Sequence, residues 1–406
     1  MKFDFPASAA FFAFVGIIVV AFACDSPSKR MEGFERGLHP QPEMDVGRLF
    51  DYGSERLSVI DRMAEHEVPG LAVTVIDDGR IDWTKTWGVR DSATGDPVTS
   101  ETVFEAGSTT KLVTAALVMM LVEEGTLSLD DPVNDQLTRW KIPENELTAV
   151  RPVTLRMLLA HTSGLNRPDS MFAYQAGSVP YLLEVLDGEA PAINDPVTVE
   201  AVPGERHSYS NLAYNVIQLL IEDATGKQFV EVARERVFEP RAMTSCTYEF
   251  PFSDEALGRV AFPHDREGKS HMNDLHPSAL AHGGLLCTSE DLAKLGVELV
   301  RAYRGESRLM TAATVREMLR DQHDPEDAVG GFNGQGLGLF ILSDDETLYF
   351  AHQGYNVPGT CCLLFANPET GDGCVVMANG AGGFGLIFEI IAGLADLYDW
   401  PEIEIG

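Results

Sequence analysis

A serine three residues before a lysine is the most informative feature of this chain. Ser108–Lys111 (Ser-Thr-Thr-Lys) opens the run 109–124, which is apolar nearly all round and predicts a buried helix that ends at Gly125. Because residues at i and i+3 share a helix face, Lys111 Nζ can reach Ser108 Oγ. The free N–H groups at the helix start can stabilise an oxyanion. This spacing predicts acyl transfer through a serine that a lysine activates.

The spacing alone is weakly specific. Ser26–Lys29 matches the same pattern within a predicted linker, where catalysis is not expected. Short motifs recur freely, so a capping serine beside a surface lysine is the alternative for any single match. Further residues with matching chemistry are needed.

Tyr209 and Asn211 provide the second candidate motif. They precede the run 212–225, which is amphipathic and predicts a helix. Taken alone, the motif also fits a packed tyrosine beside a capping residue. Beside a serine nucleophile, Tyr209 can act as general base if positive charge from Lys111 lowers its pKa from the reference value of about 10.

A histidine before a glycine provides the third candidate. His282–Gly284, Lys294–Gly296 and His352–Gly354 all match this loose pattern. His352 is distinguished by an apparent strand, 347–351, that ends at it. A glycine there lets a substrate backbone lie close to the strand. The alternative is a half-buried strand histidine without a catalytic role.

In this order the three motifs resemble those of the penicillin-recognising serine hydrolases. The tyrosine of the second motif is similar to that of class C β-lactamases, D-alanyl-D-alanine carboxypeptidases and related esterases. Val68–Val73, Leu158–Leu165 and Gly283–Leu285 resemble stretches of the same group. The resemblance runs from about Asp51 to about Ala395.

The resemblance implies a role for each matching position. Ser108 is the nucleophile and forms an acyl-enzyme. Lys111 keeps Ser108 and Tyr209 poised for proton transfer. Tyr209 takes the serine proton and returns it to the leaving group, and Asn211 binds the substrate amide or the Lys111 ammonium.

The third motif both completes and departs from the family pattern. The resemblance implies that the N–H groups of Ser108 and of Tyr355, which follows Gly354, form the oxyanion hole. Where β-lactamases of this group have lysine and a hydroxyl residue, this chain has His352 and Gln353. A histidine with a reference pKa of about 6.5 is mostly neutral at pH 7 unless a carboxylate raises that pKa. We therefore expect weaker recognition of β-lactam carboxylates and a preference for esters, amides or small peptides, with β-lactams still possible.

A different functional class stays open beside the hydrolase. The chain could be a penicillin-binding sensor that is acylated without turnover, or an inactive scaffold. Intact Ser108, Lys111 and Tyr209 argue against an inactive site, whereas His352 keeps the sensor open. No G-x-S-x-G motif is present, which argues against an α/β-hydrolase mechanism.

Composition restricts the partners. The chain has 30 basic and 62 acidic residues, a formal net charge of −32. Such acidity disfavours nucleic acid and anionic lipid surfaces, so a small molecule or short peptide is the expected partner. We expect no cofactor and no metal site, because four histidines in one stretch lack metal-binding spacing and are predicted to be surface or capping residues: His264, His271, His276 and His282.

Besides Cys24, five cysteines remain: Cys246, Cys287, Cys361, Cys362 and Cys374. An odd number argues against a disulfide framework, so buried thiols are expected. Cys361 and Cys362 should point to opposite faces of a strand. Pairing of the runs 360–366 and 373–377 puts Cys374 opposite Phe365 or Ala366 rather than Cys361.

The N-terminus predicts export. Residues 5–23 are uncharged and apolar, and small residues precede Cys24. Ala23-Cys24 resembles a bacterial lipoprotein cleavage site with Cys24 as the lipidated residue. The alternative is an uncleaved anchor, since the run is near the minimum spanning length of about 17 residues. Either version places the protein outside the cytoplasm, tethered to a membrane through residues 25–45.

These elements predict an α+β fold, in which helices flank an antiparallel sheet and a mostly helical lobe adjoins it. Leu71–Ile76 and Arg80–Gly88 flank Asp78-Gly79, a strong hairpin turn. Further strands are expected between 336 and 378, with a helix over 386–398. We expect one hydrolase domain over 46–400, with the site between the lobes: a sheet lobe of 46–107 and 302–400 and a helical lobe of 108–301.

Overall fold

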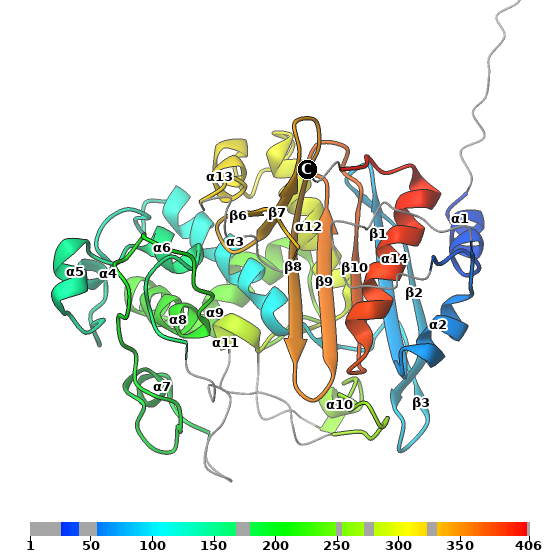
Figure 1. The fold of residues 1–406 in the computed structure, drawn as a ribbon, viewed down its shortest axis with the longest axis horizontal. Helices are drawn as coiled ribbons and strands as arrows, with labels where there is room; N and C mark the ends of the chain where they lie inside the picture. Colours follow the sequence, from blue (N-terminus) through cyan, green and yellow to red (C-terminus); the bar gives the residue numbers. More distant parts are fainter. Residues whose placement is uncertain are drawn as a thin grey trace, which may run out of the picture.

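An antiparallel sheet of eight strands organises the computed structural model, which describes residues 26–39, 55–167, 179–248, 254–271, 280–322 and 331–403. The strand order is β3-β2-β1-β10-β9-β8-β7-β6, so the two N-terminal strands of a long hairpin join the C-terminal strands (Figure 1). The strands are β1 Gly70–Asp77, β2 Arg80–Asp91, β3 Asp96–Pro97, β6 Gly334–Gln335, β7 Phe340–Ser343, β8 Leu348–Asn356, β9 Thr360–Ala366 and β10 Gly373–Ala378. A separate pair consists of β4 Phe104–Glu105 and β5 Leu286–Cys287.

The hairpin of β1 and β2 forms where the sequence predicts it. Asp78 and Gly79 both have positive φ, 47° and 66°, as a tight turn between twisted strands requires. β1 then pairs with β10 from Leu71 opposite Ala378 to Ile76 opposite Gly373. This register joins segments about 300 residues apart in the sequence into one sheet.

Both faces of the central strands are buried. In β9, Cys361, Leu363 and Phe365 belong to one hydrophobic cluster, whereas Cys362, Leu364 and Ala366 belong to another. The two adjacent cysteines therefore point to opposite faces, as predicted, and Cys374 lies opposite Phe365. Burial on both sides explains why these strands are continuously apolar instead of alternating with polar residues.

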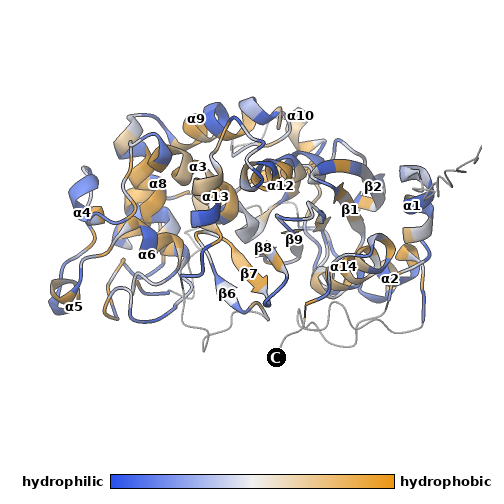
Figure 2. Ribbon diagram, turned by 90° about the horizontal axis from the view of Figure 1, so that it is seen from above, coloured by the Kyte–Doolittle hydropathy of each residue, from blue (hydrophilic) through white to orange (hydrophobic). Residues whose placement is uncertain are grey.

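Helices cover the two faces of the sheet. α14 (Gly383–Tyr398), with α1 (Pro27–Phe34) and α2 (Val59–Glu65), lies on one face, and α12 (Ser289–Tyr303) lies on the other (Figures 1 and 2). The predicted helical lobe, residues 108–301, includes α12. The structure instead packs this helix against the sheet, so the predicted lobe boundary is wrong at α12. Its apolar face, which includes Leu292, Leu295 and Leu299, is buried against the strands.

The predicted tether is also wrong for its first half. Residues 27–34 form α1, and Phe34 and Leu38 are buried in the core beneath α14. Arg30 Nη1 donates to Asp77 Oδ2 at 2.8 Å, which fixes α1 to the end of β1. The charged and turn-forming residues of this segment predict a linker. The segment folds instead because Phe34 and Leu38 pack into the hydrophobic core.

The remaining helices are α4 Val133–Gln136, α5 Glu146–Val150, α6 Leu155–Leu159, α7 Leu182–Asp187, α8 Asn211–Thr225, α9 Phe229–Ala233, α10 Asp254–Leu257, α11 Leu280–Gly283 and α13 Ala312–Met318. α3 (Thr110–Glu123) is buried from Thr110 to Leu121, and α11 and α13 pack against it (Figure 2). α3 is preceded by a 3-10 turn, Gly107–Thr109, and α8 ends at Gly226 in the left-handed conformation. Both long helices match their predicted positions within two residues.

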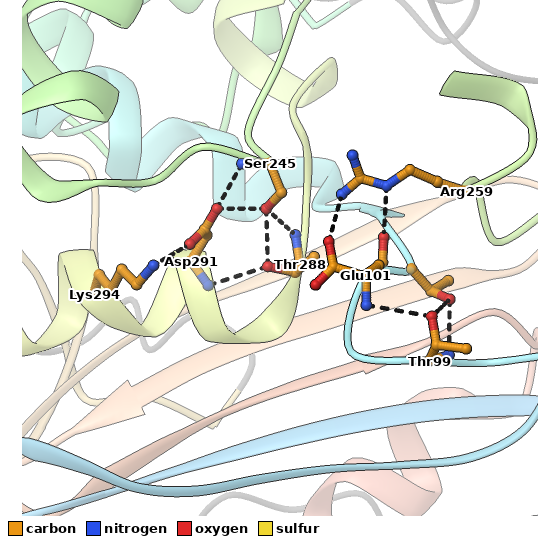
Figure 3. A network of polar contacts seen from close by, with 8 residues as sticks. Thr99, Glu101, Ser245, Arg259, Thr288, Asp291 and Lys294 are labelled. Atoms are coloured by element: carbon orange, nitrogen blue, oxygen red, sulfur yellow. Dashed lines mark hydrogen bonds and ion pairs between the residues drawn. The ribbon is translucent and has the colours of Figure 1, made fainter. Parts of the chain in front are cut away.

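One disulfide corrects the prediction of free thiols. Cys246 is bonded to Cys287, because Thr247 pairs with Leu286 and brings the two cysteines side by side across 41 residues of sequence. Figure 3 shows the polar network beside this link, in which Ser245 contacts Thr288 and Asp291 at the start of α12. The other three cysteines of the described chain are buried thiols, as expected: Cys361, Cys362 and Cys374.

Within the described residues, no helix combines the length and apolarity needed to cross a bilayer. Residues 1–25, and with them the predicted export segment and Cys24, lie outside those residues.

A buried ion pair joins α2 to α14. Glu389 is fully buried, and Arg62 donates to its two carboxylate oxygens at 2.7 and 2.6 Å. His66 Nε2 lies 2.9 Å from the same carboxylate. Because the pair is removed from water, each charge depends on the other for its solvation.

We predict that Glu389→Ala lowers the free energy of unfolding by about 3–5 kcal/mol, because Arg62 loses its buried partner and keeps only an ion pair with the exposed Glu65. Urea unfolding followed by tryptophan fluorescence measures the change. The matched control is Arg62→Met with Glu389→Leu, which removes both charges and should be less destabilised than Glu389→Ala. Equal stability of Glu389→Ala and wild type would contradict the structural role of the pair.

Candidate active site

Ser108 and Lys111 meet at the start of α3. Ser108 lies in the 3-10 turn, and Lys111 follows in the first turn of the helix. Lys111 Nζ donates to Ser108 Oγ at 3.1 Å and to the His282 carbonyl oxygen at 2.8 Å. The predicted contact between serine and lysine is therefore present, and the lysine is completely buried.

Tyr209 lies against the same lysine from the loop that leads into α8. Lys111 Nζ is 4.8 Å from the centre of the Tyr209 ring. Ser210 is the N-cap of α8, since its side chain accepts from the Ala213 N–H. The helix cap thus fixes the residue that follows the tyrosine.

His161 holds the Tyr209 loop in place. Its ring lies 4.2 Å from the Tyr209 ring, between centroids. Its carbonyl oxygen accepts from the Ser208 N–H at 2.7 Å, and its Nδ1 accepts from the Ser210 N–H at 3.1 Å. Burial holds the pKa of His161 well below its ordinary value, so the neutral ring is free to accept that bond. The sequence contained His161 in a family-like stretch but no signal of this role.

Asn211 is the first residue of α8. Its Oδ1 is buried and has no hydrogen-bond partner among the described residues. Lys111 Nζ donates to the His282 carbonyl oxygen, and no hydrogen bond joins it to Asn211 among the described residues. Contact between Asn211 and a substrate amide stays a prediction.

The expectation that four histidines are surface or capping residues is wrong for His264 and His282, which are both buried. His282 Nδ1 lies 2.7 Å from Asn215 Oδ1, and this contact holds α11 against α8 behind Lys111. His271 is half-buried, and His276 lies outside the described residues. In the part of the chain that is described, no three His, Cys, Asp or Glu side chains gather as a metal site.

β8 passes unusually close to the serine turn. A Cβ on Gly354 would lie 2.0 Å from the Ala106 carbonyl oxygen and 2.9 Å from the Ser108 nitrogen. A Cβ on Gly107, whose φ is 51°, would lie 2.8 Å from the Tyr355 nitrogen. The two glycines therefore bring the backbones of Ser108 and Tyr355 together, where the sequence predicts the oxyanion hole.

His352 occupies the middle of β8, not the end of a strand as predicted. Its ring lies 4.9 Å from the Phe340 ring, and its Nδ1 lies 2.8 Å from the Gln353 carbonyl oxygen. Burial, aided by the nearby Lys111 charge, lowers the pKa of His352 to about 3. The third motif thus holds a neutral histidine near pH 7, as expected from its residue type.

The pKa shifts of the lysine and tyrosine differ from the expectation. Burial lowers the pKa of Lys111 well below its ordinary value, and the Arg167 charge adds to this effect. Burial raises the pKa of Tyr209, although the Ser108 hydroxyl and the Arg167 charge oppose that shift. Burial therefore shifts both groups towards their neutral forms, and none of the described carboxylates contacts the Lys111 amine.

A cavity of 330 Å³ opens above the serine. Its lining residues come from the serine turn, the Tyr209 loop, the sheet and the start of α14: Ser108, Arg167, Tyr209, Phe340, Gln353, Tyr355 and Phe384. Arg167, Phe340 and Phe384 were not predicted. Phe340 and Phe384 belong to no sequence motif that indicates a site. Arg167 follows the family-like stretch Leu158–Leu165 closely, and this position is the signal that could have identified it.

Proteins of related sequence are known. Penicillin-binding protein 4 of Amycolatopsis lactamdurans is 32% identical over 327 residues, which cover 78% of this chain and 82% of that protein. An unguisins hydrolase of Aspergillus campestris is 31% identical over 194 residues, covering 44% of this chain and 33% of the hydrolase. The chain thus spans about a third of that second relative.

Similarity extends to solved structures and to a family model. The octameric penicillin-binding protein homologue of Pyrococcus abyssi superposes with a TM-score of 0.70 at 28% identity, covering 87% of this chain and 77% of that one. The family model described as Beta-lactamase matches residues 58–390. This chain therefore belongs to the Beta-lactamase family and is a serine hydrolase.

Proposed function

We propose that this hydrolase forms an acyl-enzyme on Ser108 and hydrolyses an ester, an amide or a small peptide. The hydrogen bond of 3.1 Å between Lys111 Nζ and Ser108 Oγ is the observation that supports it most directly. Tyr209 and Ser108 both line the cavity where a substrate carbonyl can be attacked. The nucleophile, its base and a proton donor are thus available in one place.

The acylation step follows from the favoured protonation states. Neutral Lys111 accepts the hydroxyl proton as Ser108 Oγ bonds to the substrate carbonyl carbon. The N–H groups of Ser108 and Tyr355 stabilise the oxyanion. When the tetrahedral intermediate collapses, the bond to the leaving group breaks, and Tyr209 donates its proton to that group. The Lys111 ammonium then returns a proton to Tyr209.

Deacylation reverses these proton transfers with water as nucleophile. Water attacks the acyl carbon and gives one proton to Tyr209, while Tyr209 passes its own proton to Lys111. When the tetrahedral intermediate collapses, the bond between the acyl carbon and Ser108 Oγ breaks, and the Lys111 ammonium returns its proton to Ser108 Oγ. The overall reaction consumes one water for each bond that is cleaved, and the protein returns to its starting state.

The walls of the cavity favour substrates with an apolar part. Phe340, Tyr355 and Phe384 provide three aromatic side chains, and His352 behind them is neutral. Beyond Ala351, β8 has no partner on the β7 side among the described residues, so an extended peptide can pair with it. The names of the relatives, a penicillin-binding protein and an unguisins hydrolase, are consistent with amide substrates.

We also propose that the protein is exported and held at a membrane. The apolar residues 5–23 followed by Cys24 support this proposal, through either lipidation of Cys24 or an uncleaved anchor.

Replacement of the nucleophile tests the reaction. We predict that wild-type protein incubated with a penicillin or an activated ester gains one acyl group by intact mass, whereas Ser108→Ala gains none. Turnover by Ser108→Ala should fall roughly 10³-fold or more. The matched control is Ser26→Ala, because Ser26 has the same spacing to a lysine but lies exposed at the start of α1.

The outcomes of that experiment separate the alternatives. An adduct on Ser108→Ala contradicts the assignment of the nucleophile. A wild-type adduct that persists without turnover favours the sensor over the hydrolase mechanism. Acylation by the ester but not the penicillin supports a substrate other than a β-lactam.

Substitution of the base gives a second test. We predict that Lys111→Arg loses acylation at every pH by roughly 10³-fold, because a guanidinium does not deprotonate in proteins. In the wild type, the acylation rate should rise as the pH passes the lowered pKa of Lys111. The rate should reach its plateau at a pH below the ordinary pKa of a lysine. Rapid-quench measurements of the acylation rate between about pH 5 and 10 give this profile.

Lys111→Met provides the matched neutral control, and circular dichroism checks that both variants are folded. Acylation by Lys111→Arg at a rate near that of the wild type would show that the lysine acts as a charge and not as a base.

The export proposal predicts that Cys24→Ala abolishes lipid attachment. Metabolic labelling with a fatty acid in a bacterial host should mark the wild type alone, since a thiol at this position is the acceptor. Membrane association of Cys24→Ala without label would favour the uncleaved anchor.

A further inference from the structure

A second cavity, with a volume of 460 Å³, is separate from the catalytic cavity, and the described lining residues of the two do not overlap. It lies between the turn of β1 and β2, the 3-10 turn Glu239–Arg241 and α12. Glu298 is the one carboxylate of its described lining, which also includes four cations: Arg80, Arg241, Lys294 and Arg301. Four positive charges against one negative leave an excess of three, in a chain with a formal net charge of −32.

The turn between β1 and β2 packs directly on α12. A Cβ on Gly79 would lie 3.3 Å from Val300 Cγ1 and 4.0 Å from Arg301 Cγ. Arg80 follows this glycine, so it lines the cavity beside Arg301 although the two come from different elements. Lys294 lies about two helical turns before Arg301 on α12 and lines the same cavity.

The two exposed arginines of this cavity have no counter-charge in the protein. The segments that line it are described without a gap over 70–91, 233–248 and 289–310. Among the described residues, no carboxylate lies within ion-pair distance of Arg80 or Arg301. Like charges that share a cavity repel each other, and an anion bound between them removes that repulsion.

Arg241 adds a buried cation to the group. Its side chain is only 7% exposed, and its Nη1 donates to the Arg236 and Val237 carbonyl oxygens at 3.0 Å each. Its buried Nε has no hydrogen-bond partner, and no carboxylate pairs with its guanidinium, among the described residues. A buried charge with an unused donor is costly unless a ligand supplies the missing acceptor.

Lys294 differs from the arginines because it is already paired. Its Nζ donates to the Ala242 carbonyl oxygen at 2.9 Å and forms an ion pair with Asp291 (Figure 3). The lysine is therefore a fixed wall of the cavity. Arg80, Arg301 and the Arg241 Nε provide the donors that remain for a ligand.

Phosphate is the anion that fits this arrangement. Guanidinium groups pair with phosphate oxygens in a bidentate manner. A phosphate monoester has up to two negative charges and three acceptor oxygens, so it can use donors from several sides, whereas a carboxylate offers two oxygens in one plane. Ile81, Val297 and Leu309 add apolar lining to the same cavity.

We propose that this cavity binds a phosphate monoester with an apolar substituent, through Arg80, Arg301 and Arg241. The site is additional to the acyl-enzyme chemistry at Ser108 and does not depend on it. A free phosphate ester is the ligand source that the charge of the chain favours, because a net charge of −32 repels an anionic lipid surface.

Phenyl phosphate and its uncharged counterpart phenol are the probes, and isothermal titration calorimetry of the full chain at low ionic strength measures their Kd. We expect the wild type to bind phenyl phosphate and not phenol. The affinity should fall about 10-fold or more in Arg80→Gln and in Arg301→Gln, the size expected for a lost hydrogen bond between charged groups. Both residues are exposed, and circular dichroism checks that the variants are folded.

Three further variants serve as controls. Glu298→Gln removes the negative charge of the lining and should strengthen binding about 3-fold or more. Arg36→Gln removes an exposed arginine outside the lining and should leave the affinity unchanged. Arg167→Gln removes the cation of the catalytic cavity and should also leave it unchanged.

A soluble lipid distinguishes the two sources of the phosphate. Dihexanoyl phosphatidic acid, below its micelle concentration, has the same headgroup chemistry on a glycerolipid. Tighter binding of this lipid than of phenyl phosphate, lost in Arg301→Gln, supports the site and assigns a lipid headgroup to it. Tighter binding of phenyl phosphate supports the site and assigns a free phosphate ester.

Three outcomes overturn the proposal. One is a wild type that binds neither phosphate compound, or that binds phenol as tightly as phenyl phosphate. Another is equal affinity in the wild type, Arg80→Gln and Arg301→Gln. The third is a loss confined to Arg167→Gln, because the anion then lies in the catalytic cavity.

Discussion

The burial of one lysine is the constraint on which the site depends. Lys111 is removed from water in the first turn of α3, and among the described residues its amine bonds a serine hydroxyl and a backbone carbonyl. Without a carboxylate partner, the charged form is costly, so the amine is driven towards its neutral, proton-accepting state. The burial of Lys111 requires an apolar α3. It also requires α8 and α11, which close the space behind the lysine.

Close approach of two backbones is the second requirement. β8 crosses the serine turn so tightly that Gly107 and Gly354 have no room for a side chain. Thr109 Oγ1 donates to the His352 carbonyl oxygen at 3.0 Å and fixes the same contact. The third motif is therefore constrained at its glycine by backbone geometry. The side chain at its first position packs on Phe340 and lies within hydrogen-bond distance of the Gln353 carbonyl oxygen, so a neutral histidine fits there without contact to the serine hydroxyl.

Local patterns predicted the parts of the fold that depend on local structure. The Asp78-Gly79 turn, α3, α8 and the pairing of Cys374 opposite Phe365 follow from turn chemistry and hydrophobic period. Features that depend on distant pairing were not accessible. The Cys246–Cys287 bond requires the Thr247 and Leu286 bridge, and the burial of His282 requires α11 to lie against α8. Arg167 enters the cavity through the path of a loop, which no spacing rule describes.

The position of the cation determines which part of a substrate the site can read. A lysine in the third motif would place its charge on β8, whereas Arg167 places it on the helical side, over Tyr209. Because burial lowers the pKa of His352, β8 has no charge at this position near pH 7, and among the described lining residues of the cavity Arg167 is the charged one. The positive potential in the cavity therefore originates on the side of Tyr209 and not on the strand.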